Sequence, residues 1–359
     1  MGEAQQKILV FRLGSIGDFV IALPCFRMVR QRNPNAEVIL LTNIPSSQRI
    51  IPAEHVLQGT GYVDRYIKYP GATRDIADMW RLRRAIAAEA PDELVYLVES
   101  RGAFSIYRDC LFFKACGIRR INGAPLFPWQ GKLRRPTPGS DLWEQEAHRL
   151  RRLTAMPGAS NFNFDIRVDL NLMKDEVDAA TRLLNEAFPA EFLQRGGRFL
   201  GMSIGTNQEI NQWSEGNWRR VVQVLGNLGL GLVLVGGSEN RERSEQLARH
   251  WAGPYLNLCG SISPRLSAGV LGHACLFIGH DSGPMHLAAA VGTPCVGIFS
   301  RRNLPGKWFP LGSGHHILYP TARSGNIHSI TPRQVIASVI DALETVAHQG
   351  APVTMRRVG

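Results

Sequence analysis

The sequence predicts an α/β protein with two doubly wound, Rossmann-like domains, and three observations support this prediction. The chain has 359 residues, enough for two α/β domains of roughly 150 to 180 residues each. Short apolar strands alternate with helical stretches along most of its length, which is the pattern of repeated βαβ units. Residues 276–299 alone contain a complete strand, turn, helix and second strand.

The first half of the chain predicts one domain over residues 1–170. Apolar runs indicate strands at Ile8–Phe11, Val38–Leu41 and Leu94–Val98, and the stretches between and after them indicate helices at Phe19–Arg32, Trp80–Ala90 and Arg108–Cys116. An edge strand fits Phe164–Leu170, and we expect the domain boundary near residues 165–175. Residues 122–140 are rich in proline, glycine and basic residues without periodicity, which is typical of a functional loop.

The second half predicts another domain over residues 171–330. Strands are indicated at Phe199–Ser203, Leu230–Val235, Leu276–Ile278 and Val296–Phe299, and helices at Leu172–Phe188, Trp218–Leu228, Glu242–Trp251, Arg265–His273 and Met285–Val291. A closing helix is expected over Pro332–Ala347, within a final segment that covers residues 331–359 and ends in a tail.

The segment LFIGHDSGPMHLAAAVGTPCVGIF, residues 276–299, carries the clearest site signal. Pro284 stands at the first turn of its helix, where a missing N–H costs nothing, and Gly292 can supply the left-handed cap. The amides near Ser282 and Gly283 would then point out of the carboxyl edge of a parallel sheet, where a helix N-terminus favours an anion. The alternative is a well-capped core helix with His286 packed inside.

A second motif, ILVFRLGSIGDFVIALP, lies near the N-terminus, at residues 8–24. Its Gly14 and Gly17 follow a strand, which fits a phosphate or sugar loop but also an ordinary tight turn. Asp18 comes directly after this loop and is a candidate general base. The alternative is that Asp18 is the N-cap residue of a helix that begins at Phe19.

Composition narrows the class of protein. The chain has six scattered cysteines without a C-x-x-C pair, no run of about 18 apolar residues and no signal-peptide core, so we expect a cytoplasmic protein with reduced thiols. Its net charge of +11 favours anionic lipid headgroups or phosphorylated glycans as partners. Recognition motifs for nucleic acid are absent. Each basic cluster, such as Arg149, Arg151 and Arg152, also fits a solvated helix face.

The segment HDSGPMHLAAA, residues 280–290, resembles the donor-binding signature of glycosyltransferase family 9, the ADP-heptose:lipopolysaccharide heptosyltransferases. Residues 8–24 are similar to the opening of the same family, and residues 231–249 and 257–279 resemble its C-terminal half in order and spacing. The resemblance implies the GT-B architecture: two facing domains, the first for the acceptor and the second for a nucleotide sugar, with a cleft between them. In proteins of this type the closing helix packs back on the first domain.

The resemblance also implies the chemistry. We expect an inverting, metal-independent glycosyltransferase that moves heptose or another sugar from a nucleotide-diphosphate donor to a lipopolysaccharide core or related surface glycan. ADP-heptose is the donor that the resemblance favours. Asp18 would be the catalytic base, and the helix dipole with nearby amides would stabilise the departing diphosphate in place of a metal. The sequence has no D-x-D pair in a suitable loop and no convincing histidine metal spacing, and we expect no cofactor. Peripheral contact with the anionic inner face of the cytoplasmic membrane fits the basic charge.

The expected donor-binding residues are Ser203, Thr206, Asn207, Asn211, Glu239, Glu242, Asp281, Ser282, Gly283, Pro284, Met285 and His286. On the acceptor side we expect Arg12, Gly14, Ser15, Gly17 and Arg101, with residues 122–140 bordering the acceptor. Glu239 and Glu242, in the region where the family contacts the ribose, equally fit solvated acids at a helix start.

One departure from the family pattern concerns the donor phosphate. Asn211 stands where the family has a phosphate-binding lysine, and Ser214 where it has a proline. A basic residue from elsewhere, among Arg12, Arg301, Arg302 and Lys307, would have to replace the lost charge. The alternative function is therefore a catalytically weak relative that binds a nucleotide sugar or anionic glycan without transfer. A more distant alternative is a GT-B epimerase that acts on the donor alone.

Overall fold

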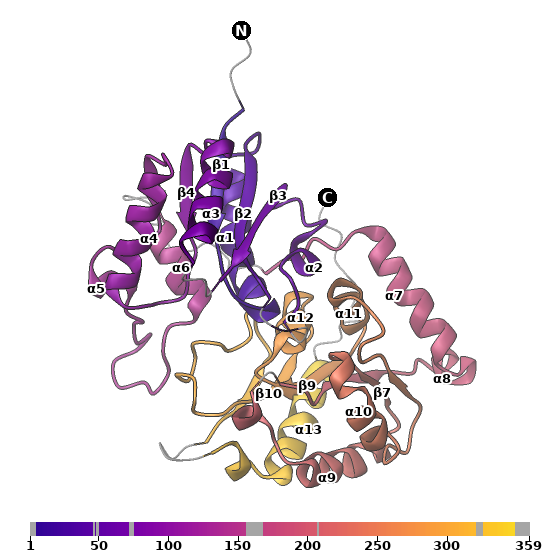
Figure 1. Ribbon diagram of the computed structural model, residues 1–359. Coiled ribbons are helices and arrows are strands. Elements are labelled where there is room, and N and C mark those ends of the chain that lie inside the picture. The colour runs from indigo at the N-terminus through magenta and orange to yellow at the C-terminus, as the bar shows by residue number, and fades with distance from the viewer. Residues whose placement is uncertain are drawn as a thin grey trace. The chain divides into compact units, whose positions relative to one another are not determined.

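The computed structural model describes residues 5–45, 47, 50–71, 75–155, 168–206, 208–320 and 326–348. The chain divides into two compact units, Met1–Arg167 and Val168–Gly359, and each contains its own parallel sheet (Figure 1). The expected strand at Phe164–Leu170 lies mostly outside the described residues, and so does the tail after residue 348.

The first domain is a five-stranded parallel sheet in the order β3-β2-β1-β4-β5. Its elements are β1 (Lys7–Phe11), α1 (Ile16–Arg32), β2 (Glu37–Ile44), α2 (Glu54–Leu57), β3 (Arg65–Pro70), α3 (Ile76–Glu89), β4 (Glu93–Tyr96), α4 (Ala103–Ala115), β5 (Arg120–Asn122), α5 (Pro128–Gly131) and α6 (Glu146–Thr154). Leu9 of β1 lies between Ile39 of β2 and Leu94 of β4, and all three are buried in the core.

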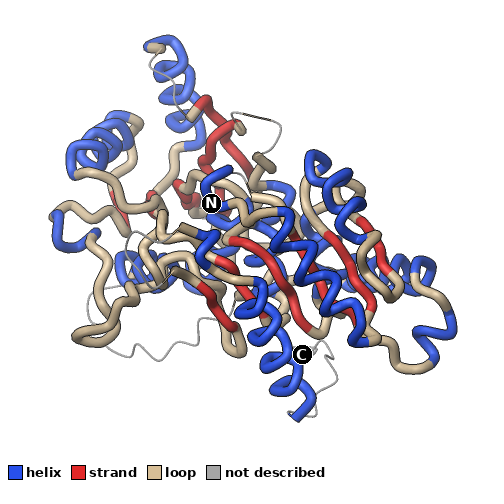
Figure 2. Tube along the Cα trace, turned by 90° about the horizontal axis from the view of Figure 1, so that it is seen from below, coloured by secondary structure: helices blue, strands red, loops and turns tan. Residues whose placement is uncertain are grey.

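The second domain is a six-stranded parallel sheet in the order β11-β10-β9-β6-β7-β8. Its elements are α7 (Lys174–Ala187), α8 (Ala190–Gln194), β6 (Phe199–Ser203), η1 (Glu209–Asn211), α9 (Glu215–Leu225), η2 (Gly226–Leu228), β7 (Gly231–Leu234), η3 (Ser238–Asn240), α10 (Arg241–Ala248), β8 (Tyr255–Asn257), α11 (Pro264–Leu271), β9 (Leu276–His280), α12 (Gly283–Ala290), β10 (Cys295–Ile298), β11 (His316–Leu318), η4 (Ile327–Ser329) and α13 (Pro332–His348). Figure 2 shows the strands with helices packed beside them.

Both faces of the second sheet are buried because successive residues of its strands point to opposite sides. Leu200 and Met202 of β6 point into a core that α9 and α13 complete, whereas Phe199 points into a second core that α7, α11 and α12 complete. Strands buried on both faces are nearly continuous apolar runs, which explains why the central strands could be predicted from the sequence.

The structure corrects several expectations about the elements. The sequence prediction missed β3, β5, β8 and β11, which lie at or next to the sheet edges and carry partly exposed residues instead of an apolar run. Helices α1 and α4 begin earlier than predicted, at Ile16 and Ala103. The expected loop over residues 122–140 contains the short helix α5.

The closing helix was expected to pack back on the first domain. The structure shows one of its faces buried in the core of the second domain, and a contact with the first domain stays a prediction. Val335, Val339 and Ala342 of α13 lie in the core with Trp218 and Val222 of α9. Their spacing of three to four residues puts them on one face of the helix, and the apolar surface of β9 and β10 offers that face a place to pack. No helix in the described part of the chain is long and apolar enough to cross a membrane.

Candidate active site

Each sheet has a topological switch point, where neighbouring strands connect in opposite directions along the sheet. In the second domain this point lies between β6 and β9, with Ser203 opposite Gly279 in the register. In open α/β sheets, ligands bind beyond the carboxyl ends of the strands at such a point. The segments after β6 and β9 contain most of the donor-binding residues expected from the sequence.

The segment after β9 forms a short polar turn and then the first turn of α12. Ser282 is the extended N-cap residue, and its hydroxyl donates to the carbonyl of His280 at 3.3 Å instead of capping the helix amides. Pro284 lies in the first turn, as predicted. The partial positive charge of this helix end and the amide of Gly283 therefore face a place where an anion can be held.

The Asp281 carboxylate lies at the start of this turn and is held from two sides. The amide nitrogen of Asn303, in the loop after β10, donates to Asp281 Oδ2 at 3.0 Å. On the other side, His286 Nε2 lies 3.6 Å from Asp281 Oδ1. His286 is 3% exposed, so it supports Asp281 from within the domain. Asp281 and His286 were expected from the sequence, but Asn303 was not.

Met285 does not present its side chain to a ligand. It is fully buried in the core among α7, α11 and α12, and a Cβ added at Gly297 would lie 3.2 Å from its sulfur. Its backbone amide donates to the carbonyl of Ser282. The side chain of Met285 is therefore not available to a ligand, because the apolar face of α12 is needed for the core, and a donor-binding role for the backbone at Met285 stays a prediction.

The segment after β6 carries the remaining donor candidates. Ser203 is 2% exposed, and the Thr206 hydroxyl accepts from the amide of Gln208 at 3.4 Å. Asn207 lies outside the described residues. Asn211 is buried in η1, where its side-chain carbonyl accepts a hydrogen bond from the hydroxyl of Ser300. At the position of the family lysine, the structure thus has a neutral amide that ties this segment to the loop after β10.

Hydrogen bonds of Trp213 and Ser214 hold the segment around Asn211 in place. The backbone amide of Trp213 donates to His280 Nε2 at 3.0 Å, and the ring of His280 packs edge-on against Trp218. Burial lowers the pKa of His280 to about 3, so its ring is neutral and can accept this bond at any ordinary pH. Ser214 caps α9 by accepting from the amide of Asn217. This role of His280 could not be predicted from the sequence, since its partner is 67 residues away.

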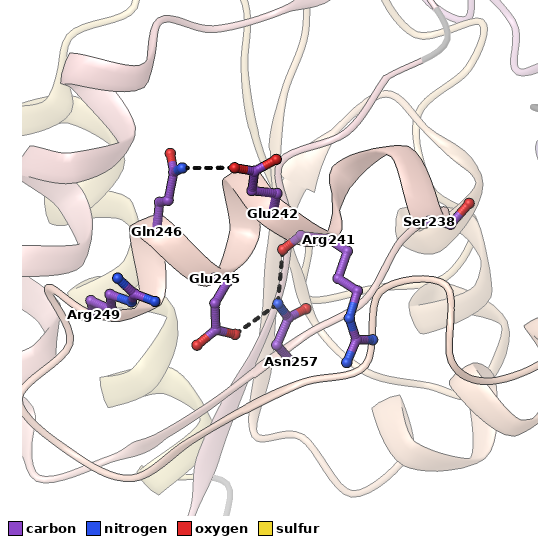
Figure 3. Close-up of a pocket in the computed structure, with 7 residues that line it drawn as sticks. All are labelled: Ser238, Arg241, Glu242, Glu245, Gln246, Arg249 and Asn257. Carbon is purple, nitrogen blue, oxygen red and sulfur yellow. Dashed lines mark hydrogen bonds between the residues drawn. The ribbon is translucent and has the colours of Figure 1, made fainter.

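The two candidate ribose acids have different surroundings. Glu239 accepts from the side-chain amide of Asn240 at 2.8 Å. Asn240 packs closely on Gly205, since a Cβ added at Gly205 would lie 2.4 Å from Asn240 Nδ2. Glu239 is therefore attached to the segment after β6. Glu242 instead lines a separate cavity of about 710 Å³ on the α10–β8 side (Figure 3). Its carboxylate accepts from Gln246 one turn later.

In the first domain the switch point lies between β1 and β4, and Asp18 lies close to it. Asp18 is the third residue of α1 and Ser15 is the N-cap, so the alternative of Asp18 as N-cap is wrong. Asp18 Oδ2 accepts from the amide and the hydroxyl of Ser15, at 2.8 and 3.2 Å. About a fifth of the Asp18 side chain remains exposed, so the carboxylate is oriented yet accessible.

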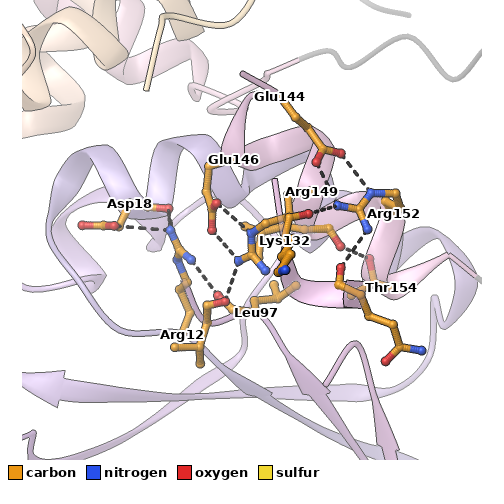
Figure 4. Close-up of polar contacts among 12 residues, drawn as sticks. Arg12, Asp18, Leu97, Lys132, Glu144, Glu146, Arg149, Arg152 and Thr154 are labelled. Atoms are coloured by element: carbon orange, nitrogen blue, oxygen red, sulfur yellow. Dashed lines mark hydrogen bonds and ion pairs between the residues drawn. The ribbon is translucent and has the colours of Figure 1, made fainter. Parts of the chain in front are cut away.

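Arg12 also contacts the N-terminal end of helix α1. Its guanidinium is fully buried and donates to the carbonyl of Leu97 at 2.7 Å and to the carbonyl of Asp18 at 2.9 Å (Figure 4). It also lies 3.4 Å from Asp18 Oδ1. With these partners Arg12 joins the ends of β1 and β4 and orients Asp18, so it is not the replacement for the missing lysine.

The other acceptor-side candidates have structural partners. Gly14 donates its amide to the side chain of Asn43 at 2.9 Å, and Gly17 is buried in the first turn of α1. Arg101 pairs with Asp109 at 3.1 Å, and Tyr96 donates to the same carboxylate at 2.9 Å. Burial, with Asp109 beside it, raises the pKa of Tyr96, so its hydroxyl stays a donor.

Arg149 was grouped with a solvated basic cluster, and the structure contradicts this. Arg149 and Glu146 are both fully buried and form a bidentate pair in α6, at 2.8 and 2.5 Å (Figure 4). Arg149 also donates to the carbonyl of Val98, next to the carbonyl that Arg12 uses. The pair therefore anchors α6 to the end of β4, a role that no local sequence signal indicated.

The fold and these two sheet edges define a protein with two Rossmann-like domains, the second with a helix N-terminus suited to a phosphate. No cluster of three or more metal-ligating side chains occurs in the described ranges. The family model of glycosyltransferase family 9 (heptosyltransferase) matches residues 145–325, half of the chain. The protein belongs to this family.

Individual relatives agree with this assignment. Lipopolysaccharide heptosyltransferase 1 of Salmonella typhimurium is 30% identical over 95 residues, which are 26% of this chain and 29% of that protein. The solved structure of a family 9 glycosyl transferase from Veillonella parvula has a TM-score of 0.72 at 16% identity and covers 96% of this chain and 99% of its own. For ADP-heptose lps heptosyltransferase II of E. coli, the TM-score is 0.68 at 18% identity, with 95% and 99% covered. The fold is therefore GT-B.

Proposed function

We propose that this protein is an inverting glycosyltransferase that moves heptose from ADP-heptose to a lipopolysaccharide core or a related anionic surface glycan. The observation that carries the proposal is the N-terminus of helix α12 at the β6–β9 switch point. A nucleotide diphosphate needs an anion site of this kind, and family membership makes a nucleotide sugar the expected donor.

In this proposal the diphosphate leaves against the start of α12. The amide of Gly283 and the helix dipole stabilise the charge that develops on it, so that transfer does not require a divalent metal. Asn211 adds no charge, but its bond to Ser300 brings the loop with Arg301 and Arg302 to the same region of the sheet edge. We propose that this loop supplies the positive charge that the lysine has in the family.

In the first domain Asp18 is the proposed base for the acceptor hydroxyl. Ser15 and Arg12 bind the carboxylate on defined sides and keep it oriented, which is what a base for direct displacement needs. Direct displacement by the acceptor hydroxyl inverts the anomeric centre. An acceptor that carries lipid would also bring the protein to the anionic inner face of the membrane.

The test combines donor binding with transfer. Calorimetric titration with ADP, UDP, GDP and CDP and their sugars, in EDTA and then with Mg²⁺, should give the tightest binding for ADP and ADP-heptose, independent of metal.

Asp18→Asn keeps an acceptor for the Ser15 amide but removes the base, so kcat should fall by roughly 10²- to 10⁴-fold while donor affinity stays the same. Asp75→Asn, the same change at the N-cap of α3, is the matched control.

Each outcome separates the alternatives. Full activity in Asp18→Asn would eliminate Asp18 as the base. Donor binding without turnover on any acceptor would favour the catalytically weak relative that the neutral Asn211 suggests. Turnover of the donor sugar alone would favour an epimerase, and preference for another nucleotide would change the donor but keep the proposed chemistry.

A further inference from the structure

Helix α4 of the first domain has two apolar faces, and only one of them is covered. Ile106 and Phe113 are buried in the domain core. On the opposite side, Phe104, Tyr107 and Leu111 follow each other at helical spacing and are 81%, 46% and 71% exposed. An aromatic and aliphatic helix face this exposed is unusual on a protein surface unless it contacts something.

The short helix α5 extends this face. The hydroxyl of Tyr107 donates to the carbonyl of Leu126 at 2.5 Å, which ties α4 to the segment before α5, and Figure 1 shows the two helices beside each other. Phe127 and Trp129 stack with ring centroids 4.6 Å apart, and both are exposed. We call the six residues Phe104, Tyr107, Leu111, Leu126, Phe127 and Trp129 the α4–α5 apolar face.

The segment that carries this face is rich in basic residues. Residues 101–140 contain eight basic residues and one acidic residue, Asp109. Asp109 is buried and already accepts from Tyr96, Arg101 and Arg108, so its charge is neutralised within the domain. The exposed basic residues follow both helices: Arg119 and Arg120 come after α4, and Lys132, Arg134 and Arg135 come after α5.

We propose that the α4–α5 apolar face docks the protein on an anionic lipid bilayer. Exposed Phe, Leu and Trp side chains insert at the level of the headgroups, and the exposed arginines and lysines that follow α4 and α5 attract anionic lipids. Nucleic acid would match the charge but leaves the aliphatic Leu111 and Leu126 without a partner. The inference rests on the proposed function for its purpose, because a lipid-borne acceptor lies at such a surface, but its evidence is independent of the donor site.

The test is co-sedimentation of the full-length protein with vesicles of phosphatidylglycerol and phosphatidylethanolamine, without nucleotide sugar or acceptor. The protein should bind these vesicles, release them as salt is raised, and bind phosphatidylcholine vesicles weakly. Phe104→Ser/Leu111→Ser should lower the partition coefficient about tenfold or more. Met173→Ser/Val224→Ser removes two exposed apolar side chains from the second domain and should bind like the wild type.

A second measurement reports contact directly and does not depend on a destabilising change. Brominated lipids should quench part of the tryptophan fluorescence, and Trp129→Phe should remove that part, because Trp129 is the tryptophan on the proposed face. Transfer to a lipid-free acceptor should be unchanged in Phe104→Ser/Leu111→Ser, so that membrane binding and catalysis are measured separately.

The proposal would be overturned by equal vesicle binding of Phe104→Ser/Leu111→Ser and the wild type, by equal binding to neutral and anionic vesicles, or by quenching that is unchanged in Trp129→Phe. Binding only when the vesicles contain the acceptor glycolipid would also overturn it, in favour of acceptor recognition alone. Because no donor is present, failure of this test leaves the proposed transferase function standing, and the reverse also holds.

Discussion

At the residue scale, the orientation of Asp18 depends on the absence of a side chain at Gly14. A Cβ added at Gly14 would lie 2.3 Å from the Asp18 carboxyl group, and Gly14 has a φ of +135°, which L side chains rarely adopt. The two glycines of the Gly-x-x-Gly motif thus have different roles: Gly17 is an ordinary helix residue, and Gly14 makes room for the Asp18 carboxylate.

We predict that Gly14→Ala destabilises the fold by about 2 kcal/mol and also lowers kcat at least tenfold, because the methyl group displaces the carboxylate. Gly61→Ala is the matched control: Gly61 has a φ of +73°, but a Cβ added there would meet no atom of the described residues within 4 Å. Denaturant unfolding and steady-state transfer assays would measure the two effects. A Gly14→Ala enzyme with wild-type kcat would show that Asp18 does not need this space.

At the element scale, the beginning of the second domain is held by one arginine of α11. Arg265 forms a bidentate pair with Glu176 of α7, with both distances 2.6 Å, and donates to the backbone carbonyls of Leu170 and Asn171. Close to it, a Cβ added at Gly269 would lie 3.1 Å from that of Ala180, so α7 and α11 approach closely. The residues that lead into α7 are therefore attached to the domain before that helix begins.

Arg265→Met should lower the free energy of unfolding by about 3 kcal/mol, since it removes the charged partner of Glu176 and the hydrogen bonds to two backbone carbonyls in a mostly buried place. Lys174→Met breaks an exposed ion pair on the same helix, with Asp178, and should cost at most about 0.5 kcal/mol. Chemical denaturation of both variants makes the comparison. Equal effects would mean that the buried pair adds no more stability than the exposed one.

At the scale of the whole molecule, each domain has its own hydrophobic core. Two buried clusters around the second sheet contain residues between Ala180 and Ala342, and one buried cluster of the first sheet contains residues between Leu9 and Ile118. The proposed donor site lies in one domain and the proposed base in the other. Folding and donor binding can therefore be separated from catalysis.

A fragment of residues 168–359 should fold cooperatively and bind ADP with an affinity within about tenfold of the full-length protein, but it should not transfer sugar because it lacks Asp18. Circular dichroism and calorimetry would test folding and binding, and the full-length Asp18→Asn variant is the control for a protein that binds without turnover. A folded fragment that does not bind ADP would place essential donor contacts in the first domain.

Several features could be predicted from the sequence because they depend on local patterns. The central strands β1, β2, β4, β6, β7, β9 and β10 were found as apolar runs, and the turn before α12 was found from the placement of Ser282 and Pro284. The family resemblance rested on such contiguous segments, and the family model confirms it. The predicted roles of Asp18 and Asp281 stay predictions, with side-chain partners now known for each.

Only the tertiary structure decided the features that join distant parts of the chain. Asn303 donates to Asp281, Trp213 donates to His280, and Arg149 donates to the carbonyl of Val98 at the end of β4. No periodicity records such contacts, because each depends on which strands become neighbours in the sheet. The same holds for the short strands at the sheet edges and for α13, which was expected as a helix but whose contacts with α9, β9 and β10 only the structure shows.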